Sequence, residues 1–406
     1  MVFVGIDWSE EHNEVEIQSA HGKVLGHRQV AADMAGLSQF QEMVVEHSED
    51  ADEVVIGIET SGGLWVNALV GCGYRVYPIN PKTSARAREG DSMAGAKSDR
   101  SDAHLLANLV RTRYRDLRPL AGDSELAQAV QVRARTHLRA VRMANRARAQ
   151  LRAALAWYFP AAVELLGTEQ TEFRDALAVL SVAPTPELAR RLSVNKLQST
   201  LKHHGRQRYL EARATQIRAK LQAPQLELSS HRVVAAHRDE VSFLVRTLLQ
   251  LRSEIDQLEA LMNQDFELHP DAEILRSLPG LGPTLGARVL AELGDDPTRY
   301  NNARARKNYA GTSPVTRSSG KWQVVTRRTA CNRRLTDALM LGARCSLNVS
   351  PGCRQYYDQL RARGQGHNQA LRMLANRLVG ILHGCLRTGR LYDEALAWPP
   401  ALKAVA

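Results

Sequence analysis

Aromatic residues are scarce in this 406-residue chain, and its cysteines are few and scattered. Phe, Trp and Tyr make up 5% of the residues, which disfavours a protein that holds nucleic-acid bases mainly on aromatic platforms. The cysteines form no C-x-x-C pair and no zinc-like spacing with histidine, so the sequence predicts reduced thiols in a cytosolic protein. The five positions are Cys72, Cys331, Cys345, Cys353 and Cys385.

Long apolar runs are also missing. No stretch of about 18 apolar residues occurs, which predicts no membrane-spanning helix. Residues 1–8 carry no positively charged segment followed by a long apolar one, as a signal peptide would. Apolar residues make up 44% of the chain and charged residues 24%, as is typical of soluble globular proteins. The length exceeds one ordinary core, and we predict three domains, over residues 1–122, 123–267 and 268–406.

Acidic and basic residues are unevenly distributed along the chain. Residues 1–98 contain 7 Lys or Arg against 15 Asp or Glu, whereas the remaining 308 residues contain 47 against 28. The whole chain has a formal net charge of +11. This balance favours a polyanionic partner, usually nucleic acid, over an arginine-rich surface that is merely solvated.

The first third has the pattern of an α/β domain. Short apolar or alternating runs between polar, Gly-bearing turns predict strands, and stretches with helical periodicity lie between them. The predicted strands are 2–6, 14–18, 24–30, 54–58 and 74–79, and the predicted helices are 37–45 and 64–70. This β-β-β-α-β-α-β order predicts a mixed sheet with helices packed on it.

The remainder is predicted to be mostly helical, beginning with helices at 100–118 and 125–155. Residues 126–163 contain seven arginines and no acidic residue. Because no carboxylates lie among these arginines to form surface ion pairs, we interpret the segment as a nucleic-acid surface and not as a solvated arm. The candidate contacts are Arg133, Arg135, Arg139, Arg142 and Arg146.

A heptad stripe of apolar residues occupies residues 241–262. Its members are spaced alternately by three and four residues, as a coiled coil requires. Three heptads are few for a coiled coil, so an intramolecular helical hairpin against residues 205–225 is an equal alternative. The stripe consists of Val241, Leu244, Leu248, Leu251, Ile255, Leu258 and Met262.

Residues 273–293 predict two helices joined by a turn that contains Gly280 and Gly282. Glycines let a backbone approach a phosphate closely, and the next helix would direct its first N–H groups toward it. The pattern resembles a helix-hairpin-helix DNA-backbone motif, and a plain helical turn is the alternative. Residues 311–332 are predicted as a loop in a largely helical C-terminal region.

Four carboxylates in the first third are candidates for metal binding. Asp7 and Glu59 each directly follow a predicted buried strand. Asp99 and Asp102 stand three residues apart at a predicted helix start, so both can face one side. Phosphodiester chemistry in the two-metal mode needs several carboxylates around two ions about 4 Å apart. Taken singly, each acid could instead be a helix cap or a solvated strand end.

Short motifs surround these acids and recur downstream. In the first third they are Gly5-Ile6-Asp7-Trp8-Ser9, Glu59-Thr60-Ser61-Gly62-Gly63-Leu64-Trp65, Asn80-Pro81-Lys82 and Lys97-Ser98-Asp99-Arg100-Ser101-Asp102-Ala103. Downstream they are Leu278-Pro279-Gly280-Leu281-Gly282, Tyr309-Ala310-Gly311, Pro314, Ser319-Gly320-Lys321 and Asn332-Arg333-Arg334-Leu335. Together they resemble the DEDD insertion-sequence transposases, a family that includes the pilin-gene invertase and the bridge-RNA-guided recombinases. The resemblance covers most of the chain, because the motifs occur in both terminal regions in the family's order.

The resemblance implies a RuvC-like N-terminal domain with the RNase H fold and a C-terminal transposase domain. It implies that the four acids hold divalent metal ions, two Mg²⁺ or Mn²⁺, and that Ser319 is a nucleophile, with Ser318 as the near alternative. A serine hydroxyl is a weak nucleophile until it is activated, and nearby cations would stabilise charge on a phosphate. The candidate cations are Arg317, Lys321, Arg327, Arg328, Arg333 and Arg334. Without the resemblance, residues 318–320 read as a flexible polar loop.

The chain departs from the family's pattern at two places. Family members commonly carry a Lys-Arg-Gly-Asn run where this chain has Arg328-Thr329-Ala330-Cys331-Asn332. Because this glycine is missing, the resemblance does not predict the local backbone conformation. Ser98 replaces the usual threonine beside Asp99, a change that spares both acids of that motif.

We therefore predict a transposase or site-specific recombinase of a bacterial insertion sequence that cuts and rejoins donor and target DNA. It would be cytoplasmic and associated with the nucleoid during activity. The resemblance implies guidance by a bridge RNA, and sites shared between protomers of a dimer or tetramer. One alternative is a metal-dependent junction endonuclease without a serine step. Another, from a different class, is a non-catalytic nucleic-acid-binding regulator that uses only the arginine-rich helices.

Overall fold

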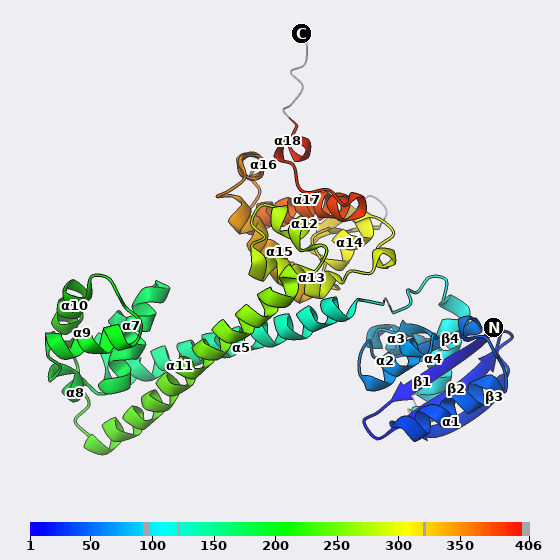
Figure 1. Cartoon of the computed structure of the whole chain (residues 1–406), viewed down its shortest axis with the longest axis horizontal. Helices are drawn as coiled ribbons and strands as arrows, with labels where there is room; N and C mark the ends of the chain where they lie inside the picture. The colour runs from blue at the N-terminus through cyan, green and yellow to red at the C-terminus, as the bar shows by residue number, and fades with distance from the viewer. Residues whose placement is uncertain (92–97, 121, 320–321, 400–406) are drawn as a thin grey trace, which may run out of the picture. The chain divides into compact units, whose positions relative to one another are not determined.

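The chain separates into two compact units in the computed structural model (Figure 1). The structure describes residues 1–91, 98–120, 122–319 and 322–399. The first unit contains Met1–Ser124 and Asp296–Asn301, and the second contains Glu125–Asp295 and Asn302–Ala406. The predicted division of residues 123–406 into two domains stays a prediction.

The first unit is built on a five-stranded sheet with the strand order β3-β2-β1-β4-β5. β1 pairs antiparallel with β2 and parallel with β4, and β4 pairs parallel with β5. The elements are β1 (Val2–Trp8), β2 (His12–Ser19), β3 (Val24–Ala31), α1 (Met34–Val45), η1 (Ala51–Glu53), β4 (Val54–Ile58), α2 (Leu64–Gly71) and β5 (Arg75–Pro78). The predicted element order and the mixed sheet with helices are confirmed.

Alternating strand residues build a separate core on each face of the sheet. On one face, Ile6 and Ile56 pack with apolar residues of α1 and α2. On the other face, Phe3 packs with Leu106 of helix α4 (Asp99–Arg113). The strand residues that alternate with Ile6 and Ile56 therefore point toward α4.

A helix that the sequence did not predict, α3 (Pro81–Asp91), precedes α4 and contacts it. The side-chain oxygen of Asn80 accepts a hydrogen bond from the Lys82 N–H at 2.9 Å. This Asx turn starts the helix, and the proline that follows Asn80 favours the first helical turn. The Asn80-Pro81-Lys82 motif is therefore a helix start.

Two long helices, α5 (Glu125–Tyr158) and α11 (His231–Glu267), pack along one another in the second unit (Figure 1). Around residues 147–158 of α5 lie α6 (Pro160–Leu165), α7 (Gln170–Val182), α8 (Pro186–Arg190), α9 (Val194–His203) and α10 (Leu210–Gln222). The later elements are α12 (Ala272–Ser277), α13 (Pro283–Leu293), η2 (Pro297–Arg299, part of the first unit), α14 (Ala303–Tyr309), α15 (Arg333–Ser346), α16 (Pro351–Ala362), α17 (His367–Thr388) and α18 (Glu394–Ala397). The predicted helical remainder is confirmed. None of the described helices is long and apolar enough to cross a membrane.

The heptad stripe lies on α11 and packs within the chain. Leu244 and Leu248 join a core with Leu151 of α5. The main partner is therefore α5, and not residues 205–225 as the hairpin alternative supposed, although Ile217 of α10 joins the same core. The physical reason is length: α10, the helix within residues 205–225, has 13 residues and is too short to cover the whole stripe, whereas α5 has 34.

A β-hairpin occupies part of residues 311–332, where a loop was predicted. β6 (Val315–Ser319) pairs antiparallel with β7 (Trp322–Thr326), and Ser319 lies opposite Trp322. Both strands contain β-branched residues, which favour extended pairing. The serines and the arginine obscured that signal, because they are typical of loops.

Candidate active site

The two strand-end carboxylates lie beside each other at one edge of the sheet. In the parallel β1–β4 ladder Ile6 pairs with Ile58, so Asp7 and Glu59 are the next residues along the two strands. Neighbouring strands are about 4.8 Å apart. Both acids are partly buried. The backbone therefore brings together two carboxylates that are distant in sequence.

Two glycines allow α4 to lie directly on these strands. A Cβ atom on Gly5 would come within 1.9 Å of the carbonyl oxygen of Ala103, and one on Gly57 within 2.6 Å of a Val110 methyl carbon. Side chains alternate along a strand. The acids two residues beyond each glycine therefore belong to the face that carries α4, and the first turn of α4 lies at their edge of the sheet.

That first turn carries the other two predicted ligands. Ser98 Oγ accepts a hydrogen bond from the Ser101 N–H at 3.2 Å, and Ser101 Oγ accepts one from the Ser98 N–H at 3.0 Å. The helix cap is thus Ser98, which removes the capping alternative for Asp99. Asp99 is exposed, whereas Asp102 is buried.

Helix α3 supplies partners for two of the four acids. Ser84 Oγ donates a hydrogen bond to Glu59 Oε1, and Arg88 Nη2 donates one to Asp102 Oδ1 at 2.6 Å. Ser84 and Arg88 are four residues apart, so they share one face of the helix. Sequence reasoning missed both residues, because the helix that carries them was not predicted.

The donor set has the chemistry that a hard divalent cation requires, since carboxylate oxygens are the preferred ligands of Mg²⁺. With the side chains as they stand, no group of three or more His, Cys, Asp or Glu residues in the described ranges could hold a metal ion. The contacts from Ser84 and Arg88 occupy one oxygen each of Glu59 and Asp102. The four predicted ligands share an edge of the sheet without converging on one point.

A further row of polar side chains lies on β2, on the same face of the sheet. Glu14 pairs in register with Asp7, and Glu16 with Gly5. The buried Glu16 has His104 Nδ1 2.7 Å from its Oε1 atom, and Glu14 Oε1 lies 2.9 Å from a His27 ring nitrogen. The alternation of acidic and apolar residues along β2 was the available signal for this row. The β1–β2 register places Glu14 next to Asp7 at the candidate site.

The β6–β7 hairpin presents the two candidate nucleophiles on opposite faces. Ser319 and Arg317 share one face because they are two residues apart, and Ser318 belongs to the other. All three are exposed. Gly320 and Lys321 lie outside the described residues.

Hydrogen bonds join the base of the β6–β7 hairpin to α14. Asn308 Oδ1 accepts hydrogen bonds from Ser313 Oγ at 2.5 Å and from Arg328 Nη2 at 3.2 Å. Asn332 Oδ1 caps α15 by accepting from the Leu335 N–H at 3.1 Å. The asparagine therefore keeps a defined place, although Cys331 stands where the family commonly has glycine.

A buried carboxylate on α13, Glu292, binds two of the arginines predicted to contact nucleic acid. Arg135 donates to its two oxygens at 2.9 and 3.1 Å, and Arg334 Nε donates at 2.8 Å. Asn332 Nδ2 adds a bond of 2.7 Å. Burial by itself raises the pKa of Glu292, but the hydrogen bonds from Arg135 and Asn332 lower it overall. Arg135 and Arg334 thus have a structural partner in this protein.

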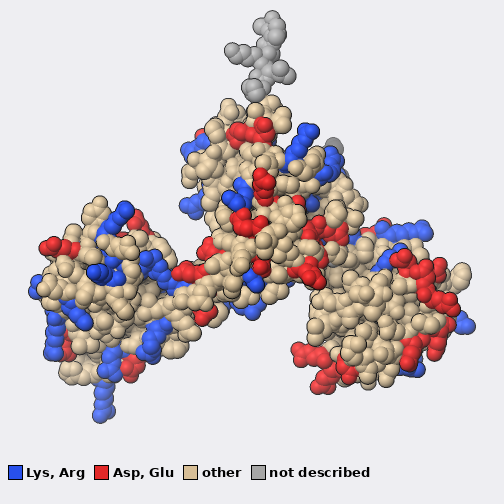
Figure 2. Space-filling view, in the orientation of Figure 1, with Lys and Arg blue, Asp and Glu red and all other residues tan. Residues whose placement is uncertain are grey.

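Other arginines of α5 also find partners on distant elements. Arg133 lies 3.0 Å from Asp265 of α11, and Arg142 lies 3.4 Å from Asp337 of α15. Acids on other elements therefore pair with these two arginines, although no acid lies among them in the sequence. Lys and Arg side chains are spread over the visible face of the second unit (Figure 2). Among the arginines predicted to contact nucleic acid, five are exposed and have no carboxylate within 4 Å in the described residues: Arg139, Arg146, Arg317, Arg327 and Arg333.

The glycines of the predicted helix-hairpin-helix turn differ from one another. A Cβ atom on Gly280 would lie 2.2 Å from the carbonyl oxygen of Gly342, so this residue is needed for the close approach of α15. Its φ of +83° also favours glycine. Gly282 is exposed, and a Cβ atom at this position would have no neighbouring atom within 4 Å. Of the two, Gly282 is the one that a phosphate can approach.

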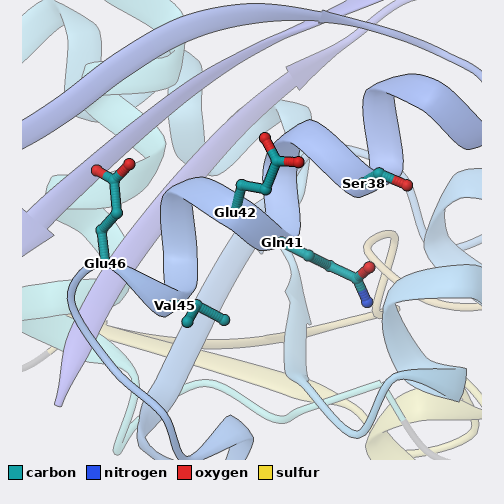
Figure 3. Close-up of a pocket in the computed structure, with 5 residues that line it drawn as sticks. All are labelled: Ser38, Gln41, Glu42, Val45 and Glu46. Atoms are coloured by element: carbon teal, nitrogen blue, oxygen red, sulfur yellow. The ribbon is translucent and has the colours of Figure 1, made fainter.

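A shallow hollow on α1 lies on the other side of the sheet from α4. Ser38, Gln41, Glu42, Val45 and Glu46 line it (Figure 3). All five come from one helix and its C-cap, and this helix packs on the face of the sheet opposite α4. The hollow is therefore separate from the candidate site.

Comparison with known proteins matches both ends of the chain. Residues 4–160 match a DEDD family model of the IS110 type described as a transposase, and residues 272–358 match one described as the transposase IS116/IS110/IS902 family. A protein of the IS117 mini-circle from Streptomyces coelicolor, named as its putative transposase, is 39% identical over 100% of this chain and 98% of its own length. Proteins of the insertion elements IS900 from Mycobacterium paratuberculosis and IS116 from Streptomyces clavuligerus are each 30% identical over 97% of this chain, and over 98% and 96% of their own lengths.

Proposed function

Because this chain belongs to the IS116/IS110/IS902 family of transposases, we propose that it cuts and rejoins DNA with two separate groups of residues. One group is the four carboxylates of the first unit, and the other centres on Ser319 in the second. The observation that carries the proposal is the in-register placement of Asp7 and Glu59 at adjacent ends of parallel strands, with the start of α4 packed on Gly5 beside them.

The carboxylates are proposed to hold Mg²⁺ or Mn²⁺. Two such ions, when bound, stabilise the charge that develops on a phosphodiester during cleavage. Asp7 and Glu59 would bind from the strand ends, and Asp99 and Asp102 from the first turn of α4. Ser84 and Arg88 would compete with a metal ion for one oxygen each of Glu59 and Asp102.

Ser319 is proposed to attack a phosphorus atom of DNA. Its Oγ forms a bond to phosphorus, the phosphorus–oxygen bond to one strand end breaks, and that end departs as a hydroxyl that carries the proton lost by the serine. The link conserves the phosphodiester, so the reverse step can join a new strand end without a further energy source. Arg317 on the same face of the hairpin supports Ser319 over Ser318, because it can stabilise the phosphate.

Bridge-RNA guidance and assembly into a dimer or tetramer are proposed from the resemblance. The carboxylates and Ser319 belong to different units, which is compatible with a site that combines the carboxylates of one protomer with the serine of another. Arg139 and Arg146 are exposed on α5 and are available for nucleic acid.

Transposition of a donor circle in cells tests the two groups separately. We expect Asp7→Ala, Glu59→Ala, Asp102→Ala and Ser319→Ala to abolish it, and the matched surface variant Asp52→Asn to retain it. Asp52 is an exposed acid of the same unit, at the opposite end of β4. Wild-type transposition by the carboxylate variants would exclude the metal-site proposal.

Trapping on a nicked substrate distinguishes rejoining from simple hydrolysis. We expect the wild type to form a covalent protein–DNA adduct that Ser319→Ala does not form and Ser318→Ala does. Cleavage without any adduct would favour a junction endonuclease, and salt-dependent binding without cleavage would favour a non-catalytic regulator.

A further inference from the structure

The segment from residue 297 to residue 392 is almost free of acidic residues. It contains 18 Lys or Arg and two acids, Asp337 and Asp358. Helices α14 and α17 carry no acid at all. Cations on these two helices therefore lack local counter-charges, and their arrangement decides whether they act together.

A polar stripe runs along one face of α17. Its members are spaced by four, four, three and four residues, which places them on one side of an α-helix. From first to last they span about 22 Å. The α17 stripe consists of Arg372, Asn376, Gly380, His383 and Arg387.

Helix α14 adds a cation at the middle of this α17 stripe. A Cβ atom on Gly380 would lie 2.9 Å from Cε and Nζ of Lys307, so the lysine side chain lies over the glycine. Glycine at this position thus leaves room for an ammonium group on the surface of α17. Lys307 completes a row of three exposed or half-buried cations with Arg372 and Arg387.

The cations repel one another in a partly buried setting. Burial lowers the pKa of His383, and the neighbouring Arg306, Arg387 and Lys307 lower it further. Burial also lowers the pKa of Arg372, and Arg327 adds to the effect. Such shifts mark a place where positive charge is already in excess, so a bound anion would stabilise it.

Donors along the α17 stripe are also left without partners. Arg372 Nε and His383 Nδ1 are buried atoms with no hydrogen bond among the described residues. No carboxylate in the described ranges lies within 4 Å of the charged groups of Lys307, Arg372 or Arg387. Arg306 of α14 differs, because its charge also acts on Asp271, and we leave it out of the proposed phosphate contacts.

The N-terminal end of the α17 stripe lies at the base of the β6–β7 hairpin, which carries Ser319. Thr312 Oγ1, on the chain entering β6, donates a hydrogen bond to Asn376 Oδ1 at 3.2 Å. On the chain leaving β7, Arg327 is near enough to lower the pKa of Arg372. A strand whose phosphate reaches Ser319 could therefore continue along α17.

We propose that Lys307, Arg372 and Arg387 bind the phosphodiester backbone of the DNA strand that reacts at Ser319. The identity of this strand rests on the proposed function, whereas the backbone contact does not. Arginine and lysine contacts to phosphates position a protein on DNA without reading its sequence. The α17 stripe would hold the reacting strand in register with the nucleophile.

Binding of the full chain to a 30-base-pair DNA duplex, measured by fluorescence anisotropy over a range of salt, tests the proposal. Each phosphate contact contributes about 0.9 to the slope of log affinity against log salt. We expect Lys307→Gln, Arg372→Gln and Arg387→Gln each to reduce the slope by about 1, and the triple variant by about 3. Arg354→Gln is the matched control, because Arg354 is an exposed arginine of the same unit paired with Asp358 at 3.0 Å. Thermal melting of every variant checks that the fold is retained.

An unchanged slope in the triple variant would overturn the proposal. A parallel titration with an RNA duplex identifies the partner, and a loss confined to RNA would overturn the assignment to DNA. The trapping experiment separates this inference from the proposed function. Reduced slopes without any wild-type adduct would support the α17 stripe and refute the serine mechanism, whereas an adduct with unchanged slopes would do the reverse.

Discussion

Arg88 and Asp102 form an ion pair within the candidate active site, with Arg88 Nη2 2.6 Å from Asp102 Oδ1. The side chain of Asp102 is 8% exposed, and a carboxylate this buried needs a counter-charge. The Arg88 guanidinium supplies that charge. If Asp102 binds a metal ion as proposed, the cation would compete with Arg88 for this carboxylate.

Replacing Arg88 tests whether it competes with a metal ion for Asp102. We expect Arg88→Gln to reduce the free energy of unfolding by about 1–3 kcal/mol without metal, because a buried carboxylate loses a charged hydrogen-bond donor. Mg²⁺ should then raise the melting temperature of the variant more than that of the wild type. Differential scanning calorimetry with and without Mg²⁺ measures both effects. Arg86→Gln, an exposed position on the same helix, should change neither, and an equal Mg²⁺ response in Arg88→Gln would contradict the competition.

Gly5 should tolerate no side chain, because α4 lies on it. We expect Gly5→Ala to cost about 1–3 kcal/mol of unfolding free energy or more, since the new Cβ would meet a backbone carbonyl at 1.9 Å. Displacement of α4 would also move Asp102 away from the strand ends and should weaken the proposed metal binding. Urea unfolding and Mg²⁺ titration measure the two losses. Gly71→Ala, which meets nothing within 4 Å, is the control, and equal stabilities of the two variants would refute the packing argument.

Glu292 should make stability depend on pH. The pKa of this carboxyl is lowered in the folded chain, so its contribution is complete above the unfolded value near 4.5 and is lost as the pH falls through the lower folded pKa. We expect Glu292→Gln to cost about 2–4 kcal/mol at pH 7, because two arginines lose a buried partner. The difference from the wild type should shrink below pH 4.5. Urea unfolding from pH 7 to pH 3.5 measures it, with the exposed Glu273→Gln as control. A difference that stays constant with pH would contradict this role.

The heptad stripe on α11 should stabilise the fold of the single chain. Leu244 is 5% exposed in a core shared with α5, and we expect Leu244→Ala to cost about 2–4 kcal/mol through lost burial and a cavity. Leu261 on the same helix is 45% exposed, and Leu261→Ala should cost less than about 1 kcal/mol. Urea unfolding at two protein concentrations measures the effect. A loss in Leu244→Ala that depends on concentration would point to a contact between chains instead.

Local patterns were enough to predict the five strands and the helices α1, α2 and α4 of the first unit. The strand 54–58 was predicted with the bounds that the structure gives, because a short β-branched run between turn residues has few other solutions. Helix α3 was missed because its Lys- and Arg-containing sequence has little apolar periodicity. The β6–β7 hairpin was missed because strand pairing depends on a partner that a single strand does not reveal.

The sequence by itself determined the mixed sheet, the helical remainder, and the positions of Asp7 and Glu59 at strand ends, because hydrophobic periodicity and turn residues act over a few positions. Only the tertiary structure decided that Gly5 and Gly57 admit α4 and that Arg88 pairs with Asp102. It also decided that Glu292 holds Arg135 and Arg334. These are contacts between elements far apart in the chain, and their distances depend on packing that no local pattern encodes.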